Sequence, residues 1–157
     1  MPRRWKAFIF LAALLATTLS FASFASAHSD NVKVLHLTGH EVESNDVDHD
    51  PGSEAPVLGD GFVLSENLLR DGRQVGISGV VCTFVRLVNP PSTLECVISA
   101  RIGSDQLTLQ SLAFDQPRNV FAITGGTGRW RNAGGQAVVR DLPTGDSDIT
   151  LFISDLG

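Results

Sequence analysis

Gln106-Leu107-Thr108-Leu109-Gln110-Ser111-Leu112 is the stretch that decides the fold, because polar and apolar side chains alternate along most of it. A repeat of two residues is typical of a β-strand that buries one face and exposes the other. Other short apolar runs surround this one, with turn-forming residues between them. None of them places apolar residues at helical spacing over three turns. The sequence therefore predicts an all-β protein.

Eight such runs follow one another at regular spacing, separated by turn residues such as Arg70-Asp71-Gly72 and Gly103-Ser104-Asp105. Eight short antiparallel strands suit a closed barrel, which leaves no unpaired edge and has room for one small ligand. We therefore expect an eight-stranded antiparallel β-barrel, and a β-sandwich is the alternative that periodicity alone leaves open. The expected strands are residues 32–38, 61–69, 74–88, 94–101, 106–114, 119–124, 135–142 and 148–154.

The composition changes between Glu41 and Asp60, where the chain carries seven acidic residues, two prolines and few apolar side chains. Such a segment is typical of a solvated loop, and we expect little regular structure in it. The expected organisation is a single domain over residues 28–157. Residues 28–56 would supply an N-terminal strand and the acidic loop, and residues 57–157 the remaining strands.

The first 27 residues have the features of a secretory signal. Arg3, Arg4 and Lys6 form a positive start, residues 7–24 carry no charge, and Ala25-Ser26-Ala27 supplies the small residues that a signal peptidase accepts. Cleavage after Ala27 would leave a secreted, extracellular protein. No later stretch approaches 18 consecutive apolar residues, so no membrane span is expected after cleavage.

The charge balance argues against a nucleic-acid partner. The whole chain has 12 Lys and Arg against 17 Asp and Glu, a net charge of −5. Loss of the leader's three cations leaves 9 against 17, a net charge of −8, with Lys33 as the only lysine. Binding of nucleic-acid phosphates requires a basic face. The sequence therefore excludes nucleic acid as a partner.

Cys82 and Cys96 are the only cysteines, and an exported chain enters an oxidising compartment. Asn89-Pro90-Pro91-Ser92 predicts a turn between them, which would place the two residues opposite one another on adjacent strands. We expect a disulfide across this hairpin, worth about 2–3 kcal/mol, with two free thiols as the alternative. Side-chain alternation then predicts an inward-facing set: Cys82, Phe84, Leu94, Cys96 and Ile98.

The glycine cluster at residues 122–130 has a superficial likeness to a nucleotide-binding turn. A dinucleotide-binding turn needs a helix directly after it, whereas Gly134-Gly135 and another strand follow here. No Lys-Ser or Lys-Thr follows the glycines, which excludes a phosphate-binding loop. We therefore expect no cofactor at this cluster and interpret it as a tight bend, in which glycine permits positive φ.

All four histidines lie between residues 28 and 49, close to acidic residues. His36, His40 and His49 with a carboxylate could bind a metal ion, and a new N-terminal His28 could chelate copper. No pair has a tight ligand spacing, so a solvated acidic loop without metal is favoured. A Gly-x-Ser-x-Gly nucleophile turn is absent, and Glu66 and Glu95 are the carboxylates expected near a barrel interior.

Four stretches stand out between residues 58 and 152: Leu58-Gly59-Asp60, Val75-Gly76-Ile77-Ser78-Gly79-Val80-Val81-Cys82, Phe121-Ala122-Ile123-Thr124-Gly125-Gly126-Thr127-Gly128 and Gly135-Gln136-Ala137-Val138. In this combination they resemble the allene oxide cyclase barrel family. The plant dirigent proteins, with their Gly-Gly-Thr-Gly motif, are similar but match less closely. The third stretch, with its Ile-Thr-Gly-Gly-Thr-Gly block, is the most specific of the four.

The resemblance implies an eight-stranded, calycin-like barrel that is often trimeric and has a hydrophobic cavity but no cofactor. In the plant cyclases that cavity holds a cation in one conformation while the ring closes, so the chemistry is conformational restraint with a few polar groups. The family's cavity cysteine matches Cys82. Its water-holding asparagine aligns with Glu66, with Asn67 one place along, and its first-strand glutamate aligns with His36.

Side-chain alternation places Phe62, Leu64 and Glu66 on one face of a strand. An inward Glu66 would lie among apolar neighbours and could act as an acid or base, or stabilise a developing cation. Two functions compete: a secreted cofactor-free cyclase or isomerase of a hydrophobic small molecule, and a non-catalytic barrel that binds an apolar ligand or a protein. The candidate catalytic residues are Glu66, Asn67, Cys82 and His36, and the candidate substrate-binding residues are Phe62, Leu64, Phe84 and Ile98.

Overall fold

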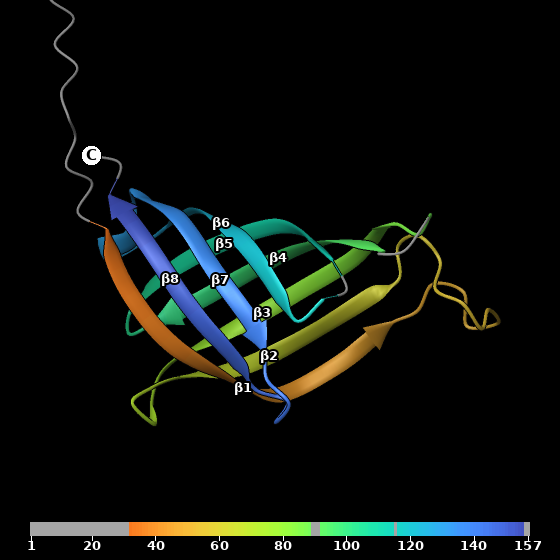
Figure 1. Cartoon of the computed structure of the whole chain (residues 1–157), viewed down its shortest axis with the longest axis horizontal. Helices are drawn as coiled ribbons and strands as arrows, with labels where there is room; N and C mark the ends of the chain where they lie inside the picture. The colour runs from red at the N-terminus through yellow and green to blue at the C-terminus, as the bar shows by residue number, and fades with distance from the viewer. Residues whose placement is uncertain (1–31, 89–91, 115, 156–157) are drawn as a thin grey trace, which may run out of the picture.

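Each strand of the chain pairs with the next in antiparallel fashion, and the last strand pairs with the first, so that the sheet closes on itself (Figure 1). The structure is a computed structural model that describes residues 32–88, 92–114 and 116–155. It confirms the eight-stranded antiparallel barrel and excludes the β-sandwich. The strands are β1 (Lys33–Val47), β2 (Gly61–Arg70), β3 (Arg73–Arg86), β4 (Thr93–Ile102), β5 (Asp105–Phe114), β6 (Arg118–Gly126), β7 (Ala133–Asp141) and β8 (Ser147–Asp155).

Strand β5 shows why the alternating stretch forms one wall of the barrel. Leu107 and Leu109 are buried inside, and the residue between them, Thr108, points away from the interior. The alternation places Ala113 inside as well, whereas Leu112 is exposed on the outer surface. A strand with one apolar face is stabilised by burying that face in the barrel interior.

The expected acidic loop over residues 41–60 is wrong in its first part. Strand β1 continues to Val47 and pairs with β2 along its whole second half, with a bulge between Glu41 and Glu43. The acidic side chains point to solvent while the backbone pairs with β2. The hydrophilic composition therefore indicated a loop where the chain forms a strand. Only residues 48–60 remain outside regular structure, at the far end of the long β1 ribbon in Figure 1.

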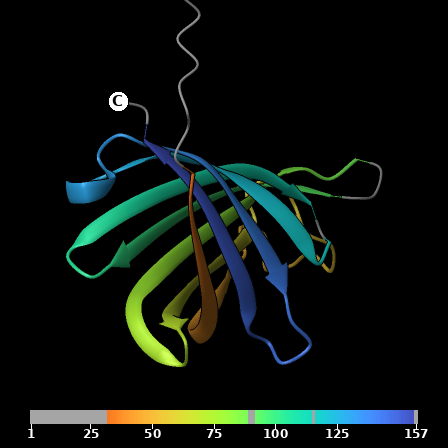
Figure 2. The ribbon, with the colours of Figure 1, turned by 60° about the vertical axis from the view of Figure 1, so that its left-hand side comes forward.

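A short 3-10 helix, η1 (Gly128–Trp130), lies between β6 and β7 at one end of the barrel. The start of β1 and the end of β8 lie at this same end in Figure 2. The Trp130 side chain is buried, and the cationic groups of Lys33 and Arg129 lie 4.8 and 4.9 Å from its ring centre. Cation–π contacts of this kind stabilise an aromatic ring at a barrel end.

The glycine cluster makes the turn into η1 possible. Gly125 and Gly128 have positive φ angles of 141° and 56°, as the interpretation of the cluster as a tight bend predicts. A Cβ atom at Gly126 would overlap the Gln106 carbonyl oxygen and the Trp130 side chain. The cluster therefore turns the chain and leaves room for the tryptophan.

Several predictions fall on residues that the structure does not describe: the signal sequence over residues 1–27, His28, and the Asn89-Pro90-Pro91 turn. Within the described ranges, no helix is long and apolar enough to cross a membrane.

Candidate functional site

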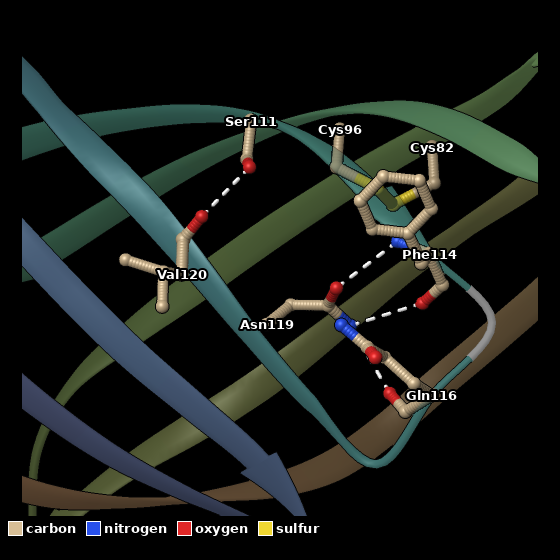
Figure 3. The surroundings of a disulfide bond; sticks show 7 residues. All are labelled: Cys82, Cys96, Ser111, Phe114, Gln116, Asn119 and Val120. Atoms are coloured by element: carbon tan, nitrogen blue, oxygen red, sulfur yellow. Dashed lines mark hydrogen bonds between the residues drawn. A yellow bond between two sulfur atoms is a disulfide. The ribbon is translucent and has the colours of Figure 1, made fainter.

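Cys82 and Cys96 form a disulfide between β3 and β4, as the hairpin argument predicts. The two residues are direct partners in the strand pairing, with Cα atoms 4.1 Å apart. Both side chains face the interior and are 4% and 2% exposed (Figure 3). Because Cys82 is oxidised, it has no thiolate and cannot act as a nucleophile in this state.

The barrel encloses an apolar cavity of about 250 Å³ that opens at the end opposite Trp130. The residues around its mouth come from the ends of strands, namely Phe62, Phe114, Asp141 and Ser147. Apolar side chains form most of the wall, and the disulfide is part of it. The other apolar lining residues are Leu37, Leu64, Leu68, Val80, Leu94, Ile98, Ala100, Leu109, Ala113, Phe121, Val139, Ile149 and Leu151.

Glu66 is the polar centre of this cavity. Its Oε2 accepts a hydrogen bond from the Ser78 hydroxyl at 2.6 Å, and its Oε1 accepts one from the Ser147 hydroxyl at 2.7 Å. Both serines are buried. A carboxylate with a donor on each oxygen is held in one orientation, which suits it to act on a ligand in a defined position.

Gly39 provides the space for this arrangement. It pairs with Ser147 across the β1–β8 junction, and a Cβ atom there would overlap both Ser147 Oγ and Glu66 Oε1. The Glu66 carboxylate therefore lies over a position that only glycine leaves open.

Asp141 adds a second carboxylate at the mouth of the cavity. Partial burial raises the pKa of Asp141 above 3.8, and the negative charge of Glu66 raises it further. The Asp141 side chain is nevertheless exposed in part, and solvent screens its charge. Two carboxylates in one cavity, with different environments, can divide the roles of proton donor and proton acceptor.

Asn119 fixes the rim of the mouth. Its side-chain amide donates to the carbonyl oxygens of Phe114 and Gln116, and its Oδ1 accepts from the Phe114 N–H at 3.0 Å (Figure 3). These bonds hold the end of β5 against the start of β6. Phe114 is thereby kept at the mouth, where it is 42% exposed and also lines the cavity.

The structure brings together some of the residues predicted from the sequence and separates others. Phe62, Leu64, Glu66 and Ile98 line the cavity. Phe84 packs against the core without lining the cavity.

Two candidate catalytic residues lie on the outer face. Asn67 bonds to Gln74 there, and His36 lies 3.2 Å from the Thr150 hydroxyl. Glu95 also faces outward and accepts a hydrogen bond from Gln110.

Ser78, Ser147, Asp141 and Gly39 are site residues that the sequence analysis did not single out. Alternation from Cys82 places Ser78 on the inner face, and alternation from Ile149 does the same for Ser147. Alternation therefore identifies which side chains face the barrel interior, but not which side chain each of them contacts. The contact with Glu66 depends on strand register.

The histidines do not form a metal site among the residues that the structure describes, where no group of three or more potential ligands comes together. His40 Nδ1 lies 2.7 Å from Asp146, and its hydrogen bond lowers the pKa of the Asp146 carboxyl. Asp60 accepts hydrogen bonds from the backbone N–H groups of His49 and Val57, which lower the pKa of Asp60 and organise the loop before β2.

No family model and no curated protein matches this chain. Solved structures do: a pyocyanin demethylase is similar with a TM-score of 0.70 and 26% identity, over 77% of this chain and 99% of that one. A pterocarpan synthase dirigent protein has a TM-score of 0.57 at 21% identity, over 80% and 84% of the two chains. A Diels–Alderase from Streptomyces koyangensis has a TM-score of 0.61 at 16% identity, over 84% and 72%.

The chain therefore has the barrel fold that is also found in dirigent proteins and in barrels named as a cyclase or as Diels–Alderases.

Proposed function

We propose that this chain is a secreted, cofactor-free cyclase or isomerase that acts on a hydrophobic small molecule inside the barrel. The observation that carries the proposal is Glu66, a carboxylate whose two oxygens accept hydrogen bonds from serine hydroxyls in a mostly apolar cavity. Structural neighbours named as a Diels–Alderase, a dirigent protein and a demethylase support chemistry on small molecules in barrels of this shape. The narrower resemblance to the allene oxide cyclases stays a prediction.

The cavity restrains the substrate and Glu66 supplies the chemistry. In an isomerisation, the Glu66 carboxylate takes a proton from one carbon of the substrate and returns it at another, so that one C–H bond breaks, another forms and a double bond shifts between them. In a ring closure through a cation, the same carboxylate stabilises the positive charge without taking a proton. The apolar wall strengthens either effect because it excludes water.

The test begins with native mass spectrometry of the protein purified from its own secretion medium, because a retained ligand identifies the substrate class. Turnover and product stereochemistry are then compared for the wild type, Glu66→Gln and Glu95→Gln. The last is the matched control, since it makes the same change on the outer face. We expect only Glu66→Gln to lose activity. A folded Glu66→Gln variant with unchanged turnover and unchanged product would contradict the proposal.

A non-catalytic barrel that binds an apolar ligand is the second candidate. The observation that favours it is the wall itself, in which the oxidised Cys82–Cys96 pair and aliphatic side chains outnumber the polar groups. In that case a ligand recovered after prolonged incubation is chemically unchanged. Conversion of the ligand would exclude this function.

Secretion and assembly belong to the same proposal. The disulfide supports an oxidising destination, because such bonds persist outside the cytosol. A homotrimer is what the resemblance implies. Valines exposed on the outer face, such as the cross-strand partners Val81 and Val97, offer apolar surface for subunit contact. Light scattering on the purified protein measures the oligomeric state.

A further inference from the structure

The charged groups in the cavity wall are all acidic. Among the described lining residues, Glu66 and Asp141 carry charge, and none is a lysine, an arginine or a histidine. The ion pairs formed between described residues include neither of them. The cavity wall therefore presents negative charge that no cation of the described chain balances.

The two serines satisfy hydrogen bonds of Glu66 but not its charge. Ser78 and Ser147 are neutral donors, and each carboxylate oxygen has a second lone pair available for a ligand. A carboxylate facing an apolar cavity is costly without a positive partner. A neutral ligand would remove water from Glu66 without replacing it, whereas a cationic ligand would supply the missing charge.

Aromatic rings on the wall favour the same kind of ligand. Phe62, Phe114 and Phe121 line the cavity from β2, β5 and β6. The face of a phenyl ring is negative and attracts a cation, most strongly where water is excluded. A ligand whose positive charge is spread over a ring system is therefore favoured by Glu66 and by the phenylalanines of the wall.

The cavity size limits the ligand. An apolar cavity of roughly 150 Å³ holds benzene, and this one is about 250 Å³. A molecule of two or three fused rings, or an aliphatic molecule of similar bulk, is therefore the expected size.

We infer that the cavity is built for an apolar organic cation, whose single positive charge pairs with Glu66 and whose rings lie against the phenylalanines. This inference rests on the proposed small-molecule function and names the class of its ligand. Asp141 supports it: burial, and secondly repulsion from Glu66, raise the pKa of Asp141, and a cation in the cavity would offset the repulsion.

The test uses two probes of one shape and different charge: N-methylquinolinium, which is cationic, and 1-methylnaphthalene, which is neutral. Dissociation constants are measured by calorimetry for the wild type, Glu66→Gln and Glu95→Gln. We expect the wild type to bind the cation at least about tenfold more tightly than the neutral probe. Glu66→Gln should lose this preference, and Glu95→Gln, changed on the outer face, should retain it.

The outcomes separate the charge inference from the proposed activity. Equal affinity of the wild type for both probes, or no binding of the cation, overturns the inference. A cation preference that depends on Glu66, in a protein whose turnover does not change in Glu66→Gln, supports the inference and contradicts the proposed chemistry. If Glu66→Gln does not fold, Asp141→Asn takes its place, and a reduced cation preference is the supporting result.

Discussion

Ser147 donates a hydrogen bond to Glu66 Oε1 across 2.7 Å, although the two residues are 81 positions apart in the chain. The contact exists because β8 pairs with β1, where Ser147 lies opposite Gly39, and Glu66 reaches over that glycine from β2. The polar centre of the cavity is therefore completed only when the last strand closes the barrel on the first.

Ser147→Ala should lower activity while the fold persists. The substitution removes one of the two donors to Glu66, and a hydrogen bond to a charged group contributes about 1.5–3 kcal/mol. We expect a loss of about tenfold or more in kcat/KM, measured on the ligand that mass spectrometry identifies. Ser99→Ala changes a serine that alternates to the outside of β4, between Ile98 and Ala100, and should leave activity unchanged. Equal losses in the two variants would contradict the role of Ser147.

Gly39→Ala should disturb the site more than its small size suggests. The new methyl group would overlap Ser147 Oγ and Glu66 Oε1, so at least one of these groups must move and their hydrogen bond must lengthen or break. Gly79→Ala is the matched control, because a Cβ atom on that β3 glycine meets nothing within 4 Å. We expect activity to fall only in Gly39→Ala, while circular dichroism shows an intact barrel for both. Full activity in Gly39→Ala would show that Glu66 does not need its present position.

Loss of the disulfide should destabilise the barrel by about 3 kcal/mol, since the bond closes a short loop of the unfolded chain. Cys82 and Cys96 are separated by 14 positions. Urea unfolding of the Cys82→Ala/Cys96→Ala double variant gives the difference in the free energy of unfolding. Wild-type protein unfolded with a reductant provides an independent comparison. An unchanged unfolding midpoint in both experiments would contradict the prediction.

Asp141→Asn should gain stability relative to the wild type as the pH rises. The pKa of Asp141 is raised in the folded protein, so its stabilising contribution is complete below the ordinary value of 3.8 and is lost as the pH rises through the folded pKa. Solvent screening of this exposed carboxyl limits the effect to less than about 1 kcal/mol. Unfolding free energies at about pH 3 and pH 7 measure it.

Asp148→Asn is the control for that measurement, because Asp148 lies on the outer face of β8 between the inward residues Ser147 and Ile149. A larger pH-dependent difference at Asp148 than at Asp141 would contradict the assignment of the shift to the cavity.

Most of the fold could be predicted because alternation and turns are local properties. The stretch around Leu107 and Leu109 shows the buried face directly, and the spacing of Cys82 and Cys96 about their turn gives the register of one hairpin. The second half of β1 could not be found in this way. Its residues from His40 to Val47 are exposed on both faces, so their sequence does not need to alternate between polar and apolar residues.

The candidate site was only half visible for a related reason. The alternation that places Phe62, Leu64 and Glu66 on one face lies within one strand and can be seen in the sequence. The partners of Glu66 come from β3 and β8, and their identity depends on the register across two strand junctions. His36 was selected by resemblance, although alternation with Leu35 and Leu37, both buried, places it on the outer face.

The burial of Trp130 at one end of the barrel also has a spectroscopic consequence. Trp130 is the only tryptophan among the residues that the structure describes, and the sequence contains no tyrosine. Near-ultraviolet emission of the folded barrel therefore comes from one fluorophore, 5% exposed and flanked by Lys33 and Arg129, at the end away from the cavity mouth. A red shift of the Trp130 emission would report unfolding of that end. Entry of a ligand at the opposite mouth would leave the emission wavelength almost unchanged.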